Sequence, residues 1–162
     1  MNYTMFMSGE TPIGGIMALT DAGMPAEVPP YWQGTVGVDD CDATMAKAVA
    51  LGGKVVAPAM DIPNVGRFGI VADPTGAVVG VMASSDPAPA IDANAPGRVG
   101  WNELWSSDTA AAWTFYSSLF GWVETGSMEM GPGQVYRMFG RPGDAQPMGG
   151  LAPKMPQQPV SA

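Results

Sequence analysis

The sequence predicts an α+β fold in which two β-α-β-β-β modules are paired and an additional pair of strands lies at the N-terminus. The modules are predicted because residues 31–84 and 98–152 show the same order of strand-like and helix-like runs. The additional pair is predicted because residues 1–19 repeat residues near the C-terminus in the same order, at an offset of 131–135 residues. A repeat of this length is typical of a duplicated domain.

The first module begins with the run TVGV, which alternates as a strand does. Asp39 and Asp40 supply N-cap oxygens for a helix over about 42–51, and a glycine pair ends it. A turn containing Pro74 and Gly76 then joins the last two of three strand-like runs. These runs are KVVA, RFGIVA and AVVGVM.

The second module begins with the strand-like run WNELW. Ser107 or Asp108 caps the helix that follows, and Gly121 ends it. The three strand-like runs after the helix are WVET, QVYRMFG and PMGGLAP. Residues 85–97 are rich in Pro, Ala and Asp and are expected to form a linker, and residues 153–162 a tail.

The N-terminal residues resemble the last two strands of a module, with strands expected at about 3–8 and 13–19. The matching runs are Tyr3-Thr4-Met5-Phe6 with Tyr136-Arg137-Met138-Phe139, Gly14-Gly15-Ile16 with Gly149-Gly150-Leu151, and Met24-Pro25 with Met155-Pro156. Both copies suit the same place beside residues 98–125. We therefore expect a homodimer with exchanged terminal strands, the alternative being a monomer with one copy displaced.

Composition excludes several classes of function. The chain has 162 residues, of which 46% are apolar and 14% charged, as in a globular protein. Its net charge is −8, and 7 Lys and Arg residues cannot form the basic face that nucleic acid or an anionic membrane requires. The N-terminus has no signal-peptide pattern, so a cytoplasmic location is expected.

The absence of histidine excludes further kinds of chemistry. Without it, the Ser-His-Asp and Cys-His arrangements and the histidine-based metal triads cannot form. The single cysteine, Cys41, excludes an internal disulfide. It stands at a predicted helix start, where the helix dipole is expected to lower its pKa, yet no base lies nearby in the sequence and a structural role is favoured.

Two segments resemble the vicinal-oxygen-chelate superfamily, which includes glyoxalases, bleomycin-resistance proteins and dioxygenases. They are VGVDDCDATMAKAVALGG…DIPNVGRFGIVADPTGAVVGVM and WNELWSSDTAAAWTFYSSLFGW. The resemblance covers almost the whole chain and is strongest to two-domain glyoxalase-like and hydroxylase-like proteins, with the order of a truncated or permuted member. It implies that the paired modules form a cup. The fold does not determine the reaction, because this superfold has many functions.

Metal-dependent members of this superfamily take one ligand from the first strand and one from the last strand of each module. In this chain the resemblance places the four ligand positions at Trp101, Gln33, Gly80 and the pair Gly149-Gly150. Trp and Gly offer no suitable donor, and Gln is a weak one. The resemblance therefore implies a protein with no metal ligands, and we expect no cofactor.

Strand alternation places Trp101, Glu103 and Trp105 on one face and Leu104 on the other, under the helix. If the first face lines the cup, two indoles flanking a carboxylate suit a flat or cationic ligand. Alternatively, the tryptophans fill a collapsed cup and Glu103 caps a backbone group or pairs with an arginine. Both interpretations stay open at the level of sequence.

The same alternation adds Gln33, Thr35 and Met82 as candidates for ligand binding, and Tyr136 is a further candidate whose side of the sheet stays open. Gln33 and Thr35 lie in the matching strand of the first module, and Met82 lies in its last strand. Simple packing within the sheet is an alternative for each of them. Arg67 is a further candidate, either as a carboxylate-binding residue or as a loop tether.

These observations favour a metal-free protein that binds or sequesters a small aromatic or cationic compound. The first alternative is a metal-independent lyase, isomerase or hydroxylase, in which Glu103 would be the general base. The second is a rearranged fragment whose main property is oligomerisation. In the favoured interpretation no residue is catalytic.

Overall fold

A computed structural model describes residues 2–86 and 97–155 of the chain. The chain divides into two compact units, one with residues 1–32 and 90–100 and the other with residues 33–89 and 101–162. Most of the predicted linker and tail therefore lies outside the described residues. Among the described residues, no helix is long and apolar enough to cross a membrane.

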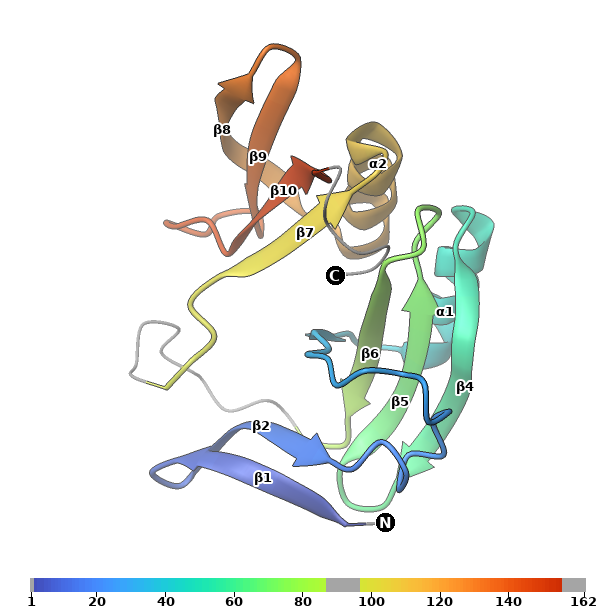
Figure 1. The fold of residues 1–162 in the computed structure, drawn as a ribbon. Helices are drawn as coiled ribbons and strands as arrows, with labels where there is room; N and C mark the ends of the chain where they lie inside the picture. Colours follow the sequence, from blue (N-terminus) through green and yellow to red (C-terminus); the bar gives the residue numbers. More distant parts are fainter. Residues whose placement is uncertain (1, 87–96, 156–162) are drawn as a thin grey trace. The chain divides into compact units, whose positions relative to one another are not determined.

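The α+β fold predicted from the sequence is confirmed, and each module has the predicted order of elements (Figure 1). The elements are β1 (Tyr3–Ser8), β2 (Thr11–Met17), β3 (Thr35–Gly37), α1 (Cys41–Ala50), β4 (Lys54–Ile62), β5 (Gly66–Ala72), β6 (Val78–Ser84), β7 (Asn102–Ser106), α2 (Thr109–Phe120), β8 (Val123–Gly131), β9 (Gln134–Gly140) and β10 (Gly149–Pro153). The strands β1 and β2 form a ribbon of their own, which we call the N-terminal ribbon.

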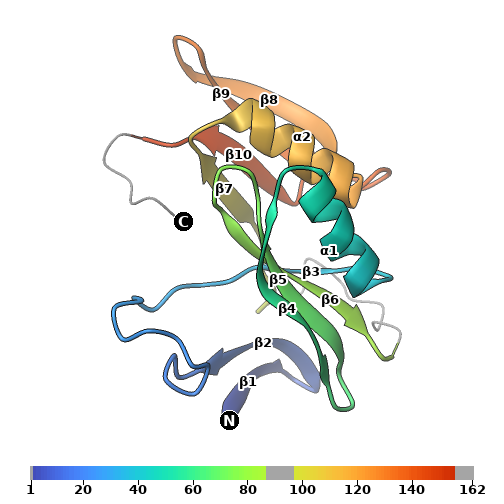
Figure 2. The ribbon, with the colours of Figure 1, turned by 90° about the vertical axis from the view of Figure 1, so that its right-hand side faces the viewer.

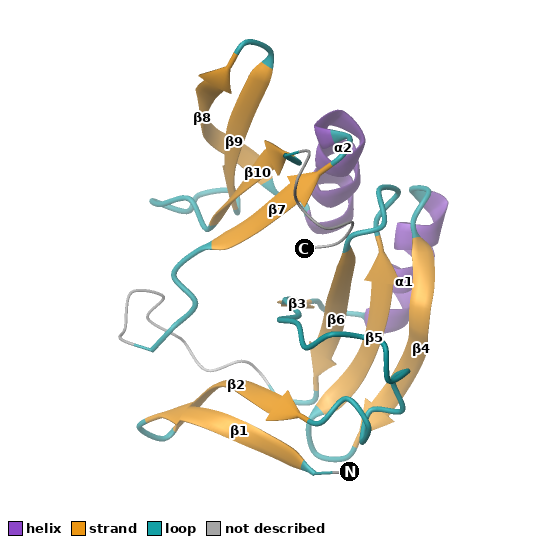
Figure 3. Cartoon of the chain, viewed as in Figure 1, coloured by secondary structure: helices purple, strands orange, loops and turns teal. Residues whose placement is uncertain are grey.

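Each module contains a four-stranded sheet, ordered β3-β6-β5-β4 in the first and β7-β10-β9-β8 in the second (Figure 3). The first strand of a module pairs in parallel with its last strand, and the other pairs are antiparallel. This order brings together strands that are far apart in the sequence. Side chains from the first, third and last strands of a module consequently meet on one face of its sheet.

The helices begin where acidic side chains cap them. Asp40 Oδ1 accepts a hydrogen bond of 2.9 Å from the backbone N–H of Ala43 at the start of α1. Asp108 Oδ1 accepts from Ala110 and Ala111 at 3.1 and 2.9 Å at the start of α2. The sequence left two cap residues open for each helix, and the structure uses Asp40 and Asp108. Satisfying otherwise unpaired N–H groups in this way stabilises a helix by about 1 kcal/mol.

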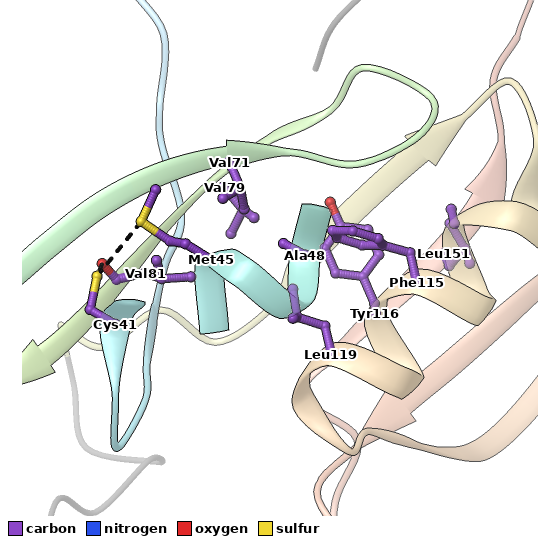
Figure 4. Packing of buried hydrophobic residues seen from close by; sticks show 11 residues of the cluster. Cys41, Met45, Ala48, Val71, Val79, Val81, Phe115, Tyr116, Leu119 and Leu151 are labelled. Carbon is purple, nitrogen blue, oxygen red and sulfur yellow. Dashed lines mark hydrogen bonds between the residues drawn. The ribbon is translucent and has the colours of Figure 1, made fainter. Parts of the chain in front are cut away.

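One apolar core extends through both modules, and Figure 2 shows α1 and α2 side by side, each packed on its own sheet. The buried residues of this core are Cys41, Met45, Ala48, Val71, Val79, Val81, Ala112, Phe115, Tyr116, Leu119 and Leu151 (Figure 4). They come from the helix-facing sides of the strands and the sheet-facing sides of the helices. The opposite face of each sheet takes no part in this core and is available for other contacts.

The turn between β5 and β6 contacts the second module. Asp73 is buried, and its Oδ1 accepts hydrogen bonds from Thr75 and Ala77 within the turn. Ser106, at the end of β7, donates from its hydroxyl to Thr75 Oγ1 at 3.2 Å. Burial raises the pKa of the Tyr116 phenol in α2, and the charge of Asp73 raises it further. The predicted turn thus also positions one module against the other.

Two strands are longer than the sequence predicts. β4 continues to Ile62 and β8 continues to Gly131, in each case well beyond the apolar run that indicated the strand. Most side chains in these extensions are exposed, so apolar alternation gives little signal there. Pairing with β5 and β9 forms the extensions, and both pairs contain register shifts. The predicted strand at 13–19 is shifted by two residues and runs over Thr11–Met17.

Candidate functional site

The candidate site lies on the face of the second sheet that turns away from α2. Leu104 packs against the core, which places its neighbours Glu103 and Trp105 on the opposite face of β7. Trp101 immediately precedes β7 and is 39% exposed. The sequence-based assignment of the two faces of this strand is therefore confirmed by the packing of Leu104.

Four residues that the sequence singled out are brought together by hydrogen bonds. The indole N–H of Trp101 donates to the hydroxyl of Tyr136 at 2.8 Å, and this hydroxyl donates to Glu103 Oε1 at 2.7 Å. The indole N–H of Trp105 donates to Glu103 Oε2 at 3.3 Å. Both oxygens of one carboxylate are thus held by neutral donors. We call these four residues the Glu103 network.

Gly150 makes the Glu103 network possible. In the sheet, β10 lies between β7 and β9, and Gly150 of β10 is level with Glu103 on one side and Met138 on the other. The ring of Tyr136 crosses over Gly150, because a Cβ built on this glycine would lie 2.0 Å from the Tyr136 hydroxyl oxygen. Only a residue without a side chain leaves room for the ring to reach Glu103.

The electrostatics of the network keep its phenol protonated. Partial burial raises the pKa of Tyr136, and the hydrogen bond to the Glu103 carboxylate raises it further, although the Trp101 donor acts in the opposite direction. The ion pairs of the described residues involve Arg67 and Arg137, and neither of them pairs with Glu103. The negative charge of Glu103 is thus oriented by neutral donors without being neutralised by a cation.

The same face continues onto β8. The sequence predicted a strand at the start of β8 but not this continuation of the face. Tyr136 pairs with Met128, and Met138 pairs with Gly126. Met128 is 56% exposed, and the Met138 methyl lies 3.0 Å from where a Cβ on Gly126 would be. A flexible thioether wall therefore extends the face beyond the Glu103 network. Met128 was missed because the predicted strand WVET ends before it, whereas β8 continues to Gly131.

The first module has a matching arrangement around Gly80. A Cβ on Gly80 would lie 2.8 Å from Thr35 Oγ1, 2.9 Å from the Phe68 ring and 3.0 Å from Gln33 Nε2. The sequence predicted Gln33 and Thr35 on this face but missed Phe68, which stands where Tyr136 stands in the second module. Met82 is next to them, paired with Gly37 and Phe68. Since Phe68 has no hydroxyl, no network like that of Glu103 can form around Gly80.

Comparison with known proteins gives the family. No family model matches the chain, but a candidate glyoxylase of Mycobacterium tuberculosis, CFP32, is 39% identical over 137 residues, which are 85% of this chain and 52% of that protein. The anthracycline biosynthesis protein DnrV of Streptomyces peucetius is 35% identical over 99 residues, which are 61% of this chain and 34% of that protein. The chain belongs to the vicinal-oxygen-chelate superfamily. It spans about half the length of CFP32.

Solved structures of the superfamily agree with this fold. The Mn(II)-bound glyoxalase from Novosphingobium aromaticivorans has a TM-score of 0.54 at 17% identity, over 74% of this chain and 41% of that chain. A variant of 4-hydroxymandelate synthase from Streptomyces coelicolor has a TM-score of 0.50 at 19% identity, over 76% of this chain and 42% of that chain. At these identities the similarity concerns the fold alone.

The structure places the four superfamily ligand positions on these two faces. Trp101 and Gly150 belong to the Glu103 network or underlie it, while Gln33 and Gly80 lie together in the first module. In residues 2–86 and 97–155, no three His, Cys, Asp or Glu side chains are grouped in a way that could hold a metal ion. The expectation of a metal-free protein stays a prediction that elemental analysis can test.

Two other residues considered from the sequence lie outside the candidate site. Arg67 in β5 donates to Asp42 in α1, with its Nε 2.5 Å from Oδ2, and to Asp61 Oδ1 in β4 at 2.9 Å, so it ties the β4–β5 hairpin to α1. Cys41 is buried, with its thiol directed at the carbonyl of Val81. The expectation of a lowered pKa for Cys41 is wrong, because burial and the charge of Asp42 raise it.

Proposed function

We propose that this glyoxalase/bleomycin-resistance-type protein is a metal-free binder of a small planar or cationic organic compound on the exposed face of its second sheet. The observation that carries the proposal is the Glu103 network. The Glu103 carboxylate is oriented by two neutral donors with no arginine or lysine paired to it, and the indoles of Trp101 and Trp105 belong to the same network. An organic cation gains from both features, through charge attraction and through contact with an aromatic face.

The hydrogen bonds also decide how a ligand would be recognised. The indole N–H groups of Trp101 and Trp105 are already used inside the network. They stay available as ring faces and not as hydrogen-bond donors. The remaining lone pairs of Glu103 and the Met128 thioether are the adaptable parts of the surface. We therefore expect charge and planarity to matter more than a particular pattern of hydrogen-bond acceptors on the ligand.

A matched set of probes tests the proposal. N-methylquinolinium, quinoline and naphthalenesulfonate are similar in shape and carry a positive, a zero and a negative charge at neutral pH. We expect the cation to quench tryptophan fluorescence at the lowest concentration and the anion at the highest. Glu103→Gln should weaken binding of the cation by about tenfold and leave binding of quinoline nearly unchanged.

The control variant is Glu129→Gln. It removes the same charge from β8 at a position paired with Val135, on the other face of the sheet. If both variants weakened binding of the cation equally, the effect would come from net charge alone and the proposed site would be wrong. Equal binding of all three probes to the wild-type chain would also contradict the proposal.

One contact favours an enzymatic alternative. The 2.7 Å hydrogen bond between Tyr136 and Glu103 places an acid and a base in direct contact, as proton transfer requires. In this alternative Glu103 is the general base of a metal-independent lyase, isomerase or hydroxylase. A pH–rate profile with glyoxal-type and catechol-type substrates tests it, with Glu103→Gln expected to lower kcat. No turnover above the uncatalysed rate would leave binding as the function.

A further inference from the structure

The N-terminal ribbon copies β9 and β10 in register as well as in sequence. In the ribbon the paired residues are Phe6 with Gly14, Met5 with Gly15, and Thr4 with Ile16. In the second module they are Phe139 with Gly149, Met138 with Gly150, and Arg137 with Leu151. Each ribbon pair therefore corresponds to one pair in the second module, although the two hairpins differ in loop length.

The copy extends to side-chain packing. A Cβ on Gly15 would lie 2.2 Å from the Tyr3 hydroxyl oxygen, as a Cβ on Gly150 would lie 2.0 Å from that of Tyr136. Tyr3 thus crosses over Gly15 toward the outer edge of β2. In the second module the same crossing brings the hydroxyl to the strand beside β10, where it finds Glu103. Within the described chain, the Tyr3 hydroxyl has no such partner.

The N-terminal ribbon differs from β9 and β10 in how far other elements cover it. In the second module Phe139 and Leu151 are 5% and 3% exposed, because Leu151 packs in the core with α2 and Phe139 stacks on Trp122, which follows α2. Their counterparts Phe6 and Ile16 are 37% and 58% exposed. Along the edge, β10 pairs with β7, whereas no strand in residues 2–86 and 97–155 pairs with the outer edge of β2. The ribbon therefore lacks both a helix and a strand where its copy has them.

The edge of the ribbon is also unprotected by charge. Neither β1 nor β2 contains a charged residue. The edge strands β4, β7 and β8 each contain at least one, whereas the three-residue edge strand β3 contains none. Charged side chains on an edge strand discourage pairing with other chains, so an uncharged apolar edge is suited to be covered.

We propose that the N-terminal ribbon is a docking surface for a separate strand–helix segment of the same kind as β7–α2. The strand of this segment pairs in parallel with β2 and carries a hydrogen-bond acceptor level with Gly15, which receives the Tyr3 hydroxyl. Its helix covers Phe6 and Ile16 with an apolar face. The chain's own β7–α2 is not available for this role, because β9 and β10 already occupy it.

A labelled peptide with the sequence of residues 98–122 and a lysine tail for solubility is the probe for this surface. Fluorescence anisotropy measures its binding to the full-length chain. We expect saturable binding, which Ile16→Asp weakens by about tenfold or more because a carboxylate would be buried. Tyr3→Phe should weaken it by about threefold through the loss of one hydrogen bond. Val55→Asp, at a similarly exposed position in β4, is the control and should not change it.

Hydrogen exchange gives a second measurement that needs no variant. The peptide should slow exchange of the amides of residues 11–17, because a new strand pairs with β2. Binding that is absent, or equal in the wild-type chain and in Ile16→Asp, would overturn the proposal. So would a dimer, seen by light scattering without peptide, that Ile16→Asp converts to a monomer. In that case a second copy covers the ribbon, as the exchanged homodimer expected from the sequence requires.

Discussion

Replacing Gly150 by alanine is the most direct perturbation of the Glu103 network. The added Cβ would lie 2.0 Å from the Tyr136 hydroxyl oxygen and 2.4 Å from its Cε1, so the ring has to leave its position. Because Tyr136 is only half-buried, the ring can swing outward and the sheet can stay intact. The expected structural result is loss of the hydrogen bonds from Trp101 to Tyr136 and from Tyr136 to Glu103.

The size of the effect follows from these two bonds. A neutral hydrogen bond contributes about 1 kcal/mol and one to a charged group about 1.5–3 kcal/mol, so their loss costs about 2.5–4 kcal/mol. Alanine also restricts the unfolded chain, which stabilises the folded state by about 0.4–1 kcal/mol where the backbone tolerates the substitution. We therefore expect Gly150→Ala to lower the free energy of unfolding by about 1.5–3.5 kcal/mol. Urea denaturation measures this change.

Two controls separate the clash from the change of backbone. Gly37→Ala adds a Cβ in a strand where no atom lies within 4 Å, so it should be neutral or slightly stabilising. Tyr136→Ala removes the ring, and Gly150→Ala should then have little further effect. If Gly150→Ala matched Gly37→Ala in stability, or destabilised equally with and without the Tyr136 ring, the inference that Gly150 makes room for the ring would be refuted.

Three further predictions concern the metal content, the pH dependence of stability and the ion pairs of Arg67. Elemental analysis of the purified protein should show no stoichiometric Zn, Ni, Fe or Mn, and one such ion per chain would contradict the expectation. The pKa of Tyr136 is raised, so the stabilisation that its phenol contributes is complete below pH about 10 and is lost as the pH rises through the folded-state pKa. The difference in ultraviolet titration between wild type and Tyr136→Phe measures this pKa. Glu103→Gln should lower the pKa of Tyr136, because it removes the carboxylate that raises it. Arg67→Met should leave the midpoint of urea denaturation close to that of the wild type, because its partners Asp42 and Asp61 are exposed.

The fold could be predicted from the sequence where local signals and packing agree. Apolar residues at helical spacing, with an aspartate before them and a glycine after them, located α2 within a residue or two. The alternation in WNELW located Leu104 under the helix and therefore the opposite face as well. Both signals reflect interactions within a few residues of the chain, which is why sequence alone was sufficient.

The site was only partly predictable, because its geometry depends on pairing between distant strands. The sequence placed Trp101, Glu103 and Trp105 on one face, yet left the side of Tyr136 open. That side is determined by β10 lying between β7 and β9, an order that no local pattern encodes. The contact of Glu103 with the Tyr136 hydroxyl was not predictable for the same reason, since it depends on the reach of the Tyr136 ring across Gly150.

A similar aromatic-over-glycine contact is made by Tyr3 over Gly15, by Phe68 over Gly80 and by Tyr136 over Gly150. The superfamily resemblance implies a last-strand ligand position at Gly80 and another at the pair Gly149-Gly150. A carboxylate side chain at either position would need the space that the ring occupies, so ring and ligand exclude each other. In the second module the ring carries a hydroxyl, and this hydroxyl orients Glu103. The orientation of Glu103 thus depends on the Tyr136–Gly150 contact, which is why Gly150→Ala and Glu103→Gln test one hypothesis from opposite sides.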